Sequence, residues 1–213
     1  MENTDDVVSA LSHVRWIGGG SGAAKSVIAG ALAEMHGATL YDTDAAMRDH
    51  AARSTPDRHP RLAAFMAMSM DDRWVQRRPQ EMLETFLWFA GEGFEFIVAD
   101  LLDLPRDRPI VVDGFRLLPR RVAPFLRDRR QAIWLLPTPA FWDQAFDARG
   151  ATWSIPNRTG DPERALSNLL ERDAPFTERL RRDTFALGLA MLQVDGTLPE
   201  EVLLQAVSDH LFE

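Results

Sequence analysis

The sequence predicts an α/β protein in which helices cover both faces of a five-stranded parallel β-sheet. Three observations support this fold class. Five short apolar runs are bounded by turn residues, helical stretches separate them, and the 213 residues are 46% hydrophobic and 26% charged, as in ordinary globular proteins. A chain of this length can bury one substantial core, so we expect a single domain over residues 1–213.

The expected strands are short apolar runs between turn residues. They cover residues 14–18, 38–42, 109–113, 131–136 and 190–194. After the first strand, apolar residues recur at helical spacing from Val27 to Met35, and Gly37 marks the end of that helix. The first strand, a glycine-rich turn and this helix therefore form one continuous strand–turn–helix unit.

Three further helical segments complete the pattern. The first is long, covering about 45–104, and contains Pro60 and Pro79 near expected helix starts. The second runs from about 162 to 187, and the third covers about 199–212. Because short apolar strands alternate with helical stretches along the chain, the strands are expected to run parallel.

A glycine-rich segment joins the first strand to the first helix. It reads Gly19-Gly20-Ser21-Gly22-Ala23-Ala24-Lys25-Ser26, followed by Val27. The phosphate-binding pattern G-x-x-x-x-G-K-[ST] is matched except at residue 24. In such a loop, successive backbone N–H groups surround a phosphate at the helix N-terminus. We expect residues 19–27 to bind nucleotide, with Ser26 as a Mg²⁺ ligand; the alternative is a Gly/Ser-rich turn without a ligand.

Lys25 is the only lysine in the chain, and the other 23 basic residues are arginine. A compact ammonium group can reach between phosphate oxygens, whereas a planar guanidinium group is a poor substitute there. The use of lysine at this one position therefore supports a phosphate-binding role for Lys25. We expect it to contact the β- and γ-phosphates and to act in catalysis.

Three aspartates follow the second and third strands, where sites lie in parallel α/β sheets. Asp113 ends an apolar strand, and we expect it to hold Mg²⁺ or a water bound to it. Asp42 and Asp44 are two residues apart, so on an extended segment they would share one face. One of them can serve the water shell of the metal while the other orients an acceptor hydroxyl. The alternative for Asp44 is a helix N-cap.

Composition excludes several classes of function. The net charge of −8 argues against nucleic acid and anionic membrane surfaces as partners. The absence of cysteine excludes disulfides and Cys-based metal sites, and the five histidines show no metal-ligand spacing and are predicted to be surface or loop residues. No secretory signal and no apolar run of membrane-spanning length is present, so we expect a cytoplasmic protein without a membrane partner.

These motifs resemble the P-loop kinases of the nucleoside-monophosphate-kinase type, and among them the shikimate and gluconate kinases. The segment Leu40-Tyr41-Asp42-Thr43-Asp44 looks like the D-x-D segment after the second strand of shikimate kinases. Over most of its length the chain also resembles an uncharacterised actinobacterial family of P-loop ATPases and kinases. The resemblance implies a P-loop kinase-like domain with three layers and the sheet order 2-3-1-4-5.

The same resemblance implies where the parts of the site lie. It places a substrate-binding helical region at about 45–104 and an arginine-bearing lid at about 149–162. It makes Asp44 the contact of the acceptor hydroxyl, which leaves Asp42 for the metal. The implied cofactor is Mg²⁺, the implied phosphoryl donor is ATP or another nucleoside triphosphate, and the implied partner is a small-molecule substrate.

Several arginines are candidates for contacts with charged groups of the ligands. In the lid region, Arg149 and Arg158 could stabilise the transferring phosphoryl group, and Arg164 and Arg172 are further possibilities. Anionic substrate groups could be received by three others: Arg73, which lies next to Trp74, together with Arg116 and Arg120. With 23 arginines in the chain, the alternative for each is a solvated surface charge.

Two departures from the family pattern affect the functional hypothesis. Ala24 replaces glycine, and Val27 stands where a threonine often follows the serine. If residue 24 needs a positive φ, alanine adds about 1–2 kcal/mol of strain, or about tenfold in affinity. We expect a phosphotransferase acting on a hydroxyl of a small metabolite, nucleoside or antibiotic. The alternatives are a nucleotide-binding protein without transfer activity and a P-loop fold that binds another phosphorylated ligand.

Overall fold

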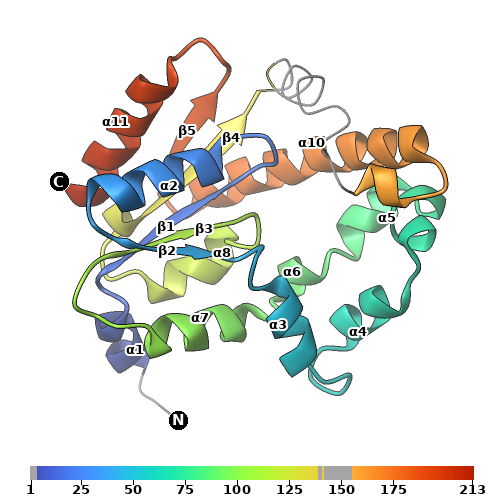
Figure 1. Cartoon of the computed structure of the whole chain (residues 1–213), viewed down its shortest axis with the longest axis horizontal. Helices are drawn as coiled ribbons and strands as arrows, with labels where there is room; N and C mark the ends of the chain where they lie inside the picture. The colour runs from blue at the N-terminus through green and yellow to red at the C-terminus, as the bar shows by residue number, and fades with distance from the viewer. Residues whose placement is uncertain (1–3, 139–140, 142–154) are drawn as a thin grey trace.

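The structure is a computed structural model, and it describes residues 4–138, 141 and 155–213 (Figure 1). Its centre is a five-stranded parallel sheet in the order β2-β3-β1-β4-β5. The strands are β1 (Val14–Gly19), β2 (Thr39–Asp42), β3 (Ile110–Asp113), β4 (Ala132–Pro137) and β5 (Ala190–Val194). The predicted fold class and strand order are confirmed, and each strand lies within one residue of its expected bounds.

Helices cover both faces of the sheet. One face carries α2 (Lys25–Met35) and α11 (Glu200–Phe212), which lie side by side in Figure 1. The other carries α1 (Thr4–Ala10), α7 (Phe94–Asp103), α8 (Pro119–Val122) and α10 (Pro162–Ala186). The helices predicted at 162–187 and 199–212 are therefore present as α10 and α11.

Alternating strand residues divide the apolar core into two clusters. On β3, Val111 packs with α2 and α11, whereas Val112 packs with α7 and α10 on the opposite face. Residues of β1 and β4 are divided in the same way. Ile17 and Ile133 belong to the cluster with α2 and α11, whereas Trp16 belongs to the cluster with α7 and α10. Both faces of the central strands are thus buried, as expected for a parallel sheet with helices on both sides.

The helical region between β2 and β3 is a series of short helices. It consists of α3 (Met47–Arg53), α4 (Pro60–Ala67), the π-helix η1 (Asp72–Gln76), α5 (Pro79–Glu84), α6 (Leu87–Ala90) and α7. Pro60 and Pro79 begin α4 and α5, as predicted. Gly91 and Gly93 adopt positive φ between α6 and α7, so the chain can change direction there.

Short 3₁₀ helices occupy several connections: η2 (Ala123–Phe125), η3 (Arg129–Gln131) and η5 (Pro156–Arg158). Of the predicted lid at 149–162, residues 149–154 lie outside the described residues, and Arg149 is among them. The described part of the lid leads through η5 into α10. None of the helices within the described ranges is both long and apolar enough to cross a membrane.

Candidate functional site

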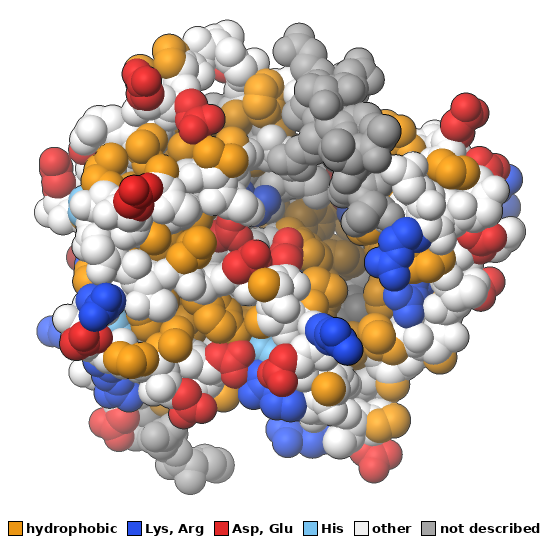
Figure 2. All heavy atoms as spheres, viewed as in Figure 1, with side chains coloured by type: hydrophobic (Ala, Val, Ile, Leu, Met, Phe, Trp, Pro, Cys, Tyr) orange, Lys and Arg blue, Asp and Glu red, His pale blue; other side chains and the backbone are white. Residues whose placement is uncertain are grey.

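The carboxyl ends of β1, β2 and β3 meet at one edge of the sheet. In the strand register, Asp113 of β3 is the partner of Ile17 on β1 and of Asp42 on β2. The glycine-rich loop after β1 and the acidic residues at the ends of β2 and β3 therefore share this edge. Viewed as in Figure 1, acidic side chains gather beside a hollow in the middle of the molecular face (Figure 2).

The backbone of the glycine-rich loop, residues 19–27, is tightly packed. A Cβ atom on Gly19 would lie 2.0 Å from the Leu135 carbonyl oxygen, and one on Gly20 would lie 2.8 Å from the Thr177 hydroxyl oxygen. Gly19 and Gly22 have φ values of 139° and 79°, which favour glycine. The sequence therefore needs its glycines here because β4 and α10 approach the loop closely.

Ala24 is the only non-glycine residue with positive φ in the part of the chain that the structure describes. Its φ is 57° and its ψ is 14°, in the left-handed region, and its carbonyl accepts a hydrogen bond from Ile28 N–H at 3.0 Å. The condition for strain at residue 24 is thus met. An alanine in this conformation costs about 1–2 kcal/mol relative to its relaxed state.

Lys25 and Ser26 open helix α2, as predicted. The Lys25 ammonium group folds back over the loop, where Nζ donates to the Gly20 carbonyl oxygen at 2.7 Å. The Ser26 side chain lies close enough to Asp113 to lower the pKa of its carboxyl group. Val27 is 52% exposed, so it contributes an apolar surface next to the loop rather than a core contact.

Asp113 is a buried carboxylate, and one of its oxygens has no partner among the described residues. Its side chain is only 2% exposed, and no described residue provides a hydrogen-bond partner for its Oδ2 atom. Burial raises the pKa of Asp113, and the charge of Asp42 raises it further, whereas Ser26 and Lys25 lower it. A buried carboxylate oxygen without a partner fits a hard cation such as Mg²⁺, because oxygen ligands are the ones that this ion prefers.

Asp42 and Asp44 do not share a strand face, contrary to the expectation from their spacing. The extended segment ends at Asp42, and its Oδ1 atom accepts hydrogen bonds from the N–H groups of Asp44 at 2.7 Å and Ala45 at 3.2 Å. The turn is closed by Asp42, and α3 begins later, at Met47, without a side-chain cap. Asp44 is therefore not the N-cap of α3, and Asp42 stabilises the turn that precedes the helix.

Asp44 lies among charged groups of the same edge. It keeps contact with solvent, yet enough protein surrounds it that desolvation raises its pKa to about 6. The carboxylates of Asp42 and Asp113 raise the pKa as well, while Lys25 and Arg116 lower it. A carboxylate with a pKa near 6 is mostly ionised at neutral pH and can accept a proton from a hydroxyl group.

Arg116 is buried beside this acidic group. It is 2% exposed, and its Nη2 atom donates to the Thr43 carbonyl oxygen at 2.6 Å and to Nδ1 of His50 at 2.8 Å. Its guanidinium group lies over the Trp88 ring, 4.9 Å from the centroid. Burial lowers the pKa of Arg116 to about 10, so it stays charged at neutral pH, and Asp44 is the strongest opposing charge. Among the described residues, none pairs with its Nε and Nη1 atoms.

The prediction of surface or loop positions for the histidines is wrong for His50, which lies within α3 and is 1% exposed. His59 lies in the loop before α4, as predicted, but it is only 2% exposed. His50 connects Arg116 to Asp100, and Tyr41 also donates to Asp100. No local sequence pattern marks these residues, since Asp100 and Arg116 are 50 and 66 positions from His50. Only the folded chain brings them together.

The remaining predicted arginines are engaged elsewhere or lie outside the described residues. Arg73 donates to the carbonyl oxygens of Phe65 and Met66, at the end of α4. Arg120 pairs with Asp183 on α10 at 2.8 Å. Arg158 is exposed on η5, and the structure places its charge near Arg73. The structure therefore groups Arg116 with Asp44 and does not bring Arg73 or Arg120 to it.

Arg172, one of the predicted arginines, contacts aromatic side chains of the helical region between β2 and β3. Arg172 lies over the rings of Trp74 and Phe86, each at 5.7 Å from the ring centroid. It also donates to Asp173, a carboxylate that is only 1% exposed. Trp74, the neighbour of Arg73 in the sequence, is thus in contact with an arginine from α10.

Comparison with known proteins gives no assignment for this chain. No protein-family model matches it, and no curated protein sequence matches it.

Proposed function

We propose that the chain is a Mg²⁺- and nucleotide-dependent phosphotransferase that acts on a hydroxyl of a small metabolite, nucleoside or antibiotic. Asp113 carries the proposal. Its buried carboxylate has an oxygen without a described partner, the side chain of Ser26 from the glycine-rich loop lowers its pKa, and its charge raises the pKa of Asp44. Phosphoryl transfer needs a phosphate cradle, metal ligands and a group that orients the nucleophile, and this edge can supply all three.

The glycine-rich loop would bind the phosphoryl donor, with ATP as the simplest candidate. Its backbone N–H groups and the N-terminus of α2 favour negative charge. Lys25 would exchange the Gly20 carbonyl oxygen, 2.7 Å away, for oxygens of the β- and γ-phosphates. Ser26 and Asp113 would hold Mg²⁺, with Asp42 beside them. When bound, Mg²⁺ neutralises part of the phosphate charge.

Asp44 would receive the proton of the acceptor hydroxyl. In the reaction, the acceptor oxygen forms a bond to the γ-phosphorus, and the bond from that phosphorus to the bridging oxygen breaks. The proton passes to Asp44, and the nucleoside diphosphate leaves. A pKa of about 6 suits this role, because the carboxylate is available at neutral pH and is still basic enough to take the proton.

Arg116 would contact an anionic group of the acceptor. Its nearest opposing charge is Asp44, and its Nε and Nη1 atoms have no described partner. A buried guanidinium group with unpaired donors favours a carboxylate or phosphate as ligand. The acceptor class is then a hydroxylated metabolite that also carries a negative charge.

One observation favours a second candidate, a nucleotide-binding protein without transfer activity. Ala24 is held at φ 57°, so the loop contains strain at the place where backbone would approach phosphate. A chain released from the need for tight nucleotide binding would tolerate this residue. A loop that holds a different phosphorylated ligand would tolerate it as well.

Turnover with a panel of hydroxylated compounds tests these candidates. The wild-type chain, with Mg²⁺ and ATP, is expected to release ADP only with certain anionic acceptors. Asp44→Asn should still bind ATP but lose turnover, and Lys25→Ala should lose both. Tight ATP binding without turnover for any acceptor would favour the non-transferring protein. Calorimetry showing no ATP binding but binding of another phosphorylated compound would favour the third possibility.

A further inference from the structure

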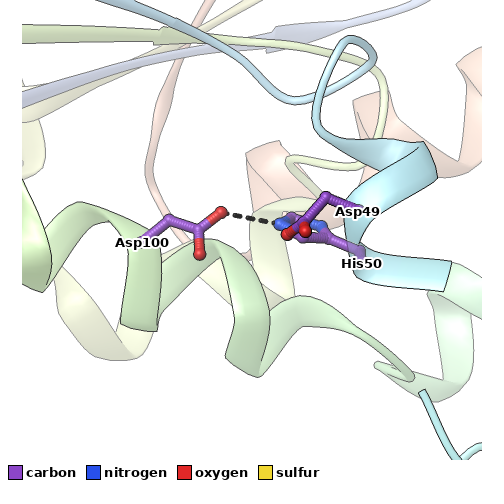
Figure 3. A group of neighbouring side chains, drawn as sticks. All are labelled: Asp49, His50 and Asp100. Carbon is purple, nitrogen blue, oxygen red and sulfur yellow. Dashed lines mark hydrogen bonds and ion pairs between the residues drawn. The ribbon is translucent and has the colours of Figure 1, made fainter. Parts of the chain in front are cut away.

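A continuous chain of hydrogen bonds runs from the substrate region to the edge of the sheet. Arg53 of α3 and Tyr41 of β2 both donate to the carboxylate of Asp100 on α7. The same carboxylate contacts Nε2 of His50 at 2.7 Å, and Nδ1 of His50 contacts Nη2 of Arg116 at 2.8 Å. Figure 3 shows Asp100 directed at the His50 ring, with Asp49 beside that ring.

The partners of His50 fix its protonation. Arg116 can only donate, so Nδ1 of His50 must be an acceptor without a hydrogen. The other ring nitrogen, Nε2, then carries the hydrogen and donates it to Asp100. Burial and the charge of Arg116 lower the pKa of His50, which agrees with a neutral ring. Asp100 thus polarises the imidazole and makes Nδ1 a stronger acceptor.

A metal ion is a poor fit for the same cluster, although its geometry is compatible. Asp49, His50 and Asp100 offer ligand atoms that lie within 4.8 Å of one another. However, Nε2 carries a hydrogen, and Asp49 is paired with Arg53 at 2.8 Å. Arg53 also pairs with Asp100 at 2.7 Å, so a cation is already present between the two carboxylates. The hydrogen bonds are therefore complete without an ion.

The guanidinium group of Arg116 is held from two directions. The Trp88 ring covers one face, and the Nη2 atom is occupied by His50 and the Thr43 carbonyl oxygen. This leaves Nε and Nη1 without partners among the described residues, close to the charge of Asp44. Rotation of the group would break the hydrogen bond to His50. The orientation of the unpaired donors thus depends on His50.

We propose that His50 is a positioning residue: backed by Asp100, it orients the guanidinium group of Arg116 so that its buried and unpaired Nε and Nη1 atoms can donate to an oxyanion of the acceptor. The ligand chemistry is a carboxylate or a phosphate on a small metabolite. This inference rests on the proposed function, because it gives Arg116 its role in acceptor binding.

The chain contains a matched control for His50. His59 is equally buried, its Nε2 atom contacts Glu95 at 2.7 Å, and its Nδ1 atom accepts from the Thr55 N–H at 3.1 Å. Both histidines pack against the ring of Phe96, with centroid distances of 5.5 and 5.1 Å. The two differ in what Nδ1 holds: an arginine for His50 and a backbone N–H for His59. Substitution of His59 therefore measures the effect of replacing a buried histidine that does not contact Arg116.

The first test is the tautomer of His50 in the full chain, measured by NMR of ¹⁵N-labelled histidine at neutral pH. The proposal predicts hydrogen on Nε2, an unprotonated Nδ1, and no change in these signals when Zn²⁺ is added at equimolar concentration. The His50 signals are assigned by their loss in His50→Gln. A hydrogen on Nδ1, a doubly protonated ring, or a specific Zn²⁺ shift at His50 would overturn the proposal.

The second test measures binding of inorganic phosphate by calorimetry in a Lys25→Ala background, which weakens the competing site at the glycine-rich loop. His50→Asn places an oxygen about where Nδ1 lies, whereas His50→Gln places an amide about where Nε2 lies. We expect phosphate affinity to fall about tenfold or more in His50→Gln and in Arg116→Ala. His50→Asn should recover most of the affinity, and His59→Gln should stay within about threefold.

Three results would contradict the proposal, and the first two concern the histidine variants. One is equal phosphate affinity in His50→Asn and His50→Gln, and the other is an equal loss in His59→Gln. Absence of phosphate binding that depends on Arg116 would also overturn it. Neither measurement uses nucleotide or turnover, so a failure of the proposed phosphotransfer leaves these results unchanged. Conversely, a failure here leaves nucleotide binding at the loop intact.

Discussion

The glycine-rich loop and the acceptor side, defined as Asp44, His50, Asp100 and Arg116, are built in different ways. The loop is a continuous segment whose shape comes from backbone conformations, with Gly19, Gly22 and Ala24 at positive φ. The acceptor side is assembled from β2, α3, α7 and the segment after β3 through side-chain hydrogen bonds. A local sequence pattern can therefore reveal the loop, whereas only the fold reveals the acceptor side.

Among the variants that test this comparison, we expect substitutions of Asp44 and Asp113 to have the largest effect on turnover. Asp44→Asn and Asp113→Asn should each lower turnover by about 100-fold or more, because one removes a proton acceptor and the other a metal ligand. Both should change the free energy of unfolding by less than about 1 kcal/mol, since each amide keeps the shape of the side chain. Steady-state kinetics and urea unfolding measure both quantities.

The roles of the two residues can be separated by their dependence on ligands. Turnover of Asp113→Asn should change its dependence on the metal when Mn²⁺ replaces Mg²⁺, whereas that of Asp44→Asn should change with the acceptor. If both variants lose the same activity at every metal and every acceptor, the division between the loop and the acceptor side is wrong.

Gly114→Ala should disrupt the packing where the segment after β3 contacts the segment after β2. A Cβ atom there would lie 1.7 Å from the Thr43 hydroxyl oxygen, and φ is 149°. We expect a loss of at least about 3 kcal/mol in the free energy of unfolding, from overpacking and backbone strain. Gly30→Ala is the control, because no other atom lies within 4 Å of a Cβ on this helical residue. It should gain about 0.5–1 kcal/mol from helix propensity. Similar values for both variants would contradict this packing.

Arg116→Ala should affect the acceptor side alone. It removes the only described donor to Nδ1 of His50 and a candidate contact of the acceptor, so kcat/KM for the acceptor should fall about 30–100-fold. Nucleotide affinity should stay within about twofold, because the loop is held by its own backbone. Calorimetry with ATP and kinetics with varied acceptor measure the two effects. Arg182→Ala, on the exposed part of α10, is the matched control. A parallel loss of ATP affinity in Arg116→Ala would show that the two regions are not separate.

Ala24→Gly gives the smallest expected effect and acts on the loop alone. Glycine adopts φ 57° without the penalty that alanine carries, so nucleotide should bind up to about tenfold tighter. Relief of the strain should also raise the free energy of unfolding, less the cost of the added freedom of the unfolded chain. Retained or increased turnover would identify Ala24 as a handicap in an active enzyme. Tighter binding with no turnover would favour the non-transferring protein, and unchanged affinity would exclude nucleotide contact at this residue.

The sheet and the loop could be predicted because their signals are local. Apolar runs such as Ile110–Asp113 and the spacing around Lys25 depend on neighbouring residues only, and the structure has both where expected. The sequence raised a positive φ at residue 24 as a condition, and Ala24 has one. These features arise from backbone geometry, which a short segment determines.

The side-chain partners could not be predicted from local pattern. His50 was assigned to the surface because it has no metal-ligand spacing, yet it is buried between Asp100 and Arg116. Asp42 and Asp44 were placed on one face of an extended segment, but the strand ends at Asp42 and that carboxylate closes the turn. Both errors arise because tertiary contacts and a strand end, neither visible locally, decide where a polar side chain points.

The most direct test of the account is a calorimetric titration of Mg²⁺·ATP into the wild-type chain and into Lys25→Ala, with Arg182→Ala as the exposed-cation control. The account predicts binding to wild type and to the control, and a loss of about 100-fold or more in Lys25→Ala, with the free energy of unfolding changed by less than about 1 kcal/mol. Equal affinity in wild type and Lys25→Ala, or unfolding of the variant, would contradict the assignment of the loop as the nucleotide site.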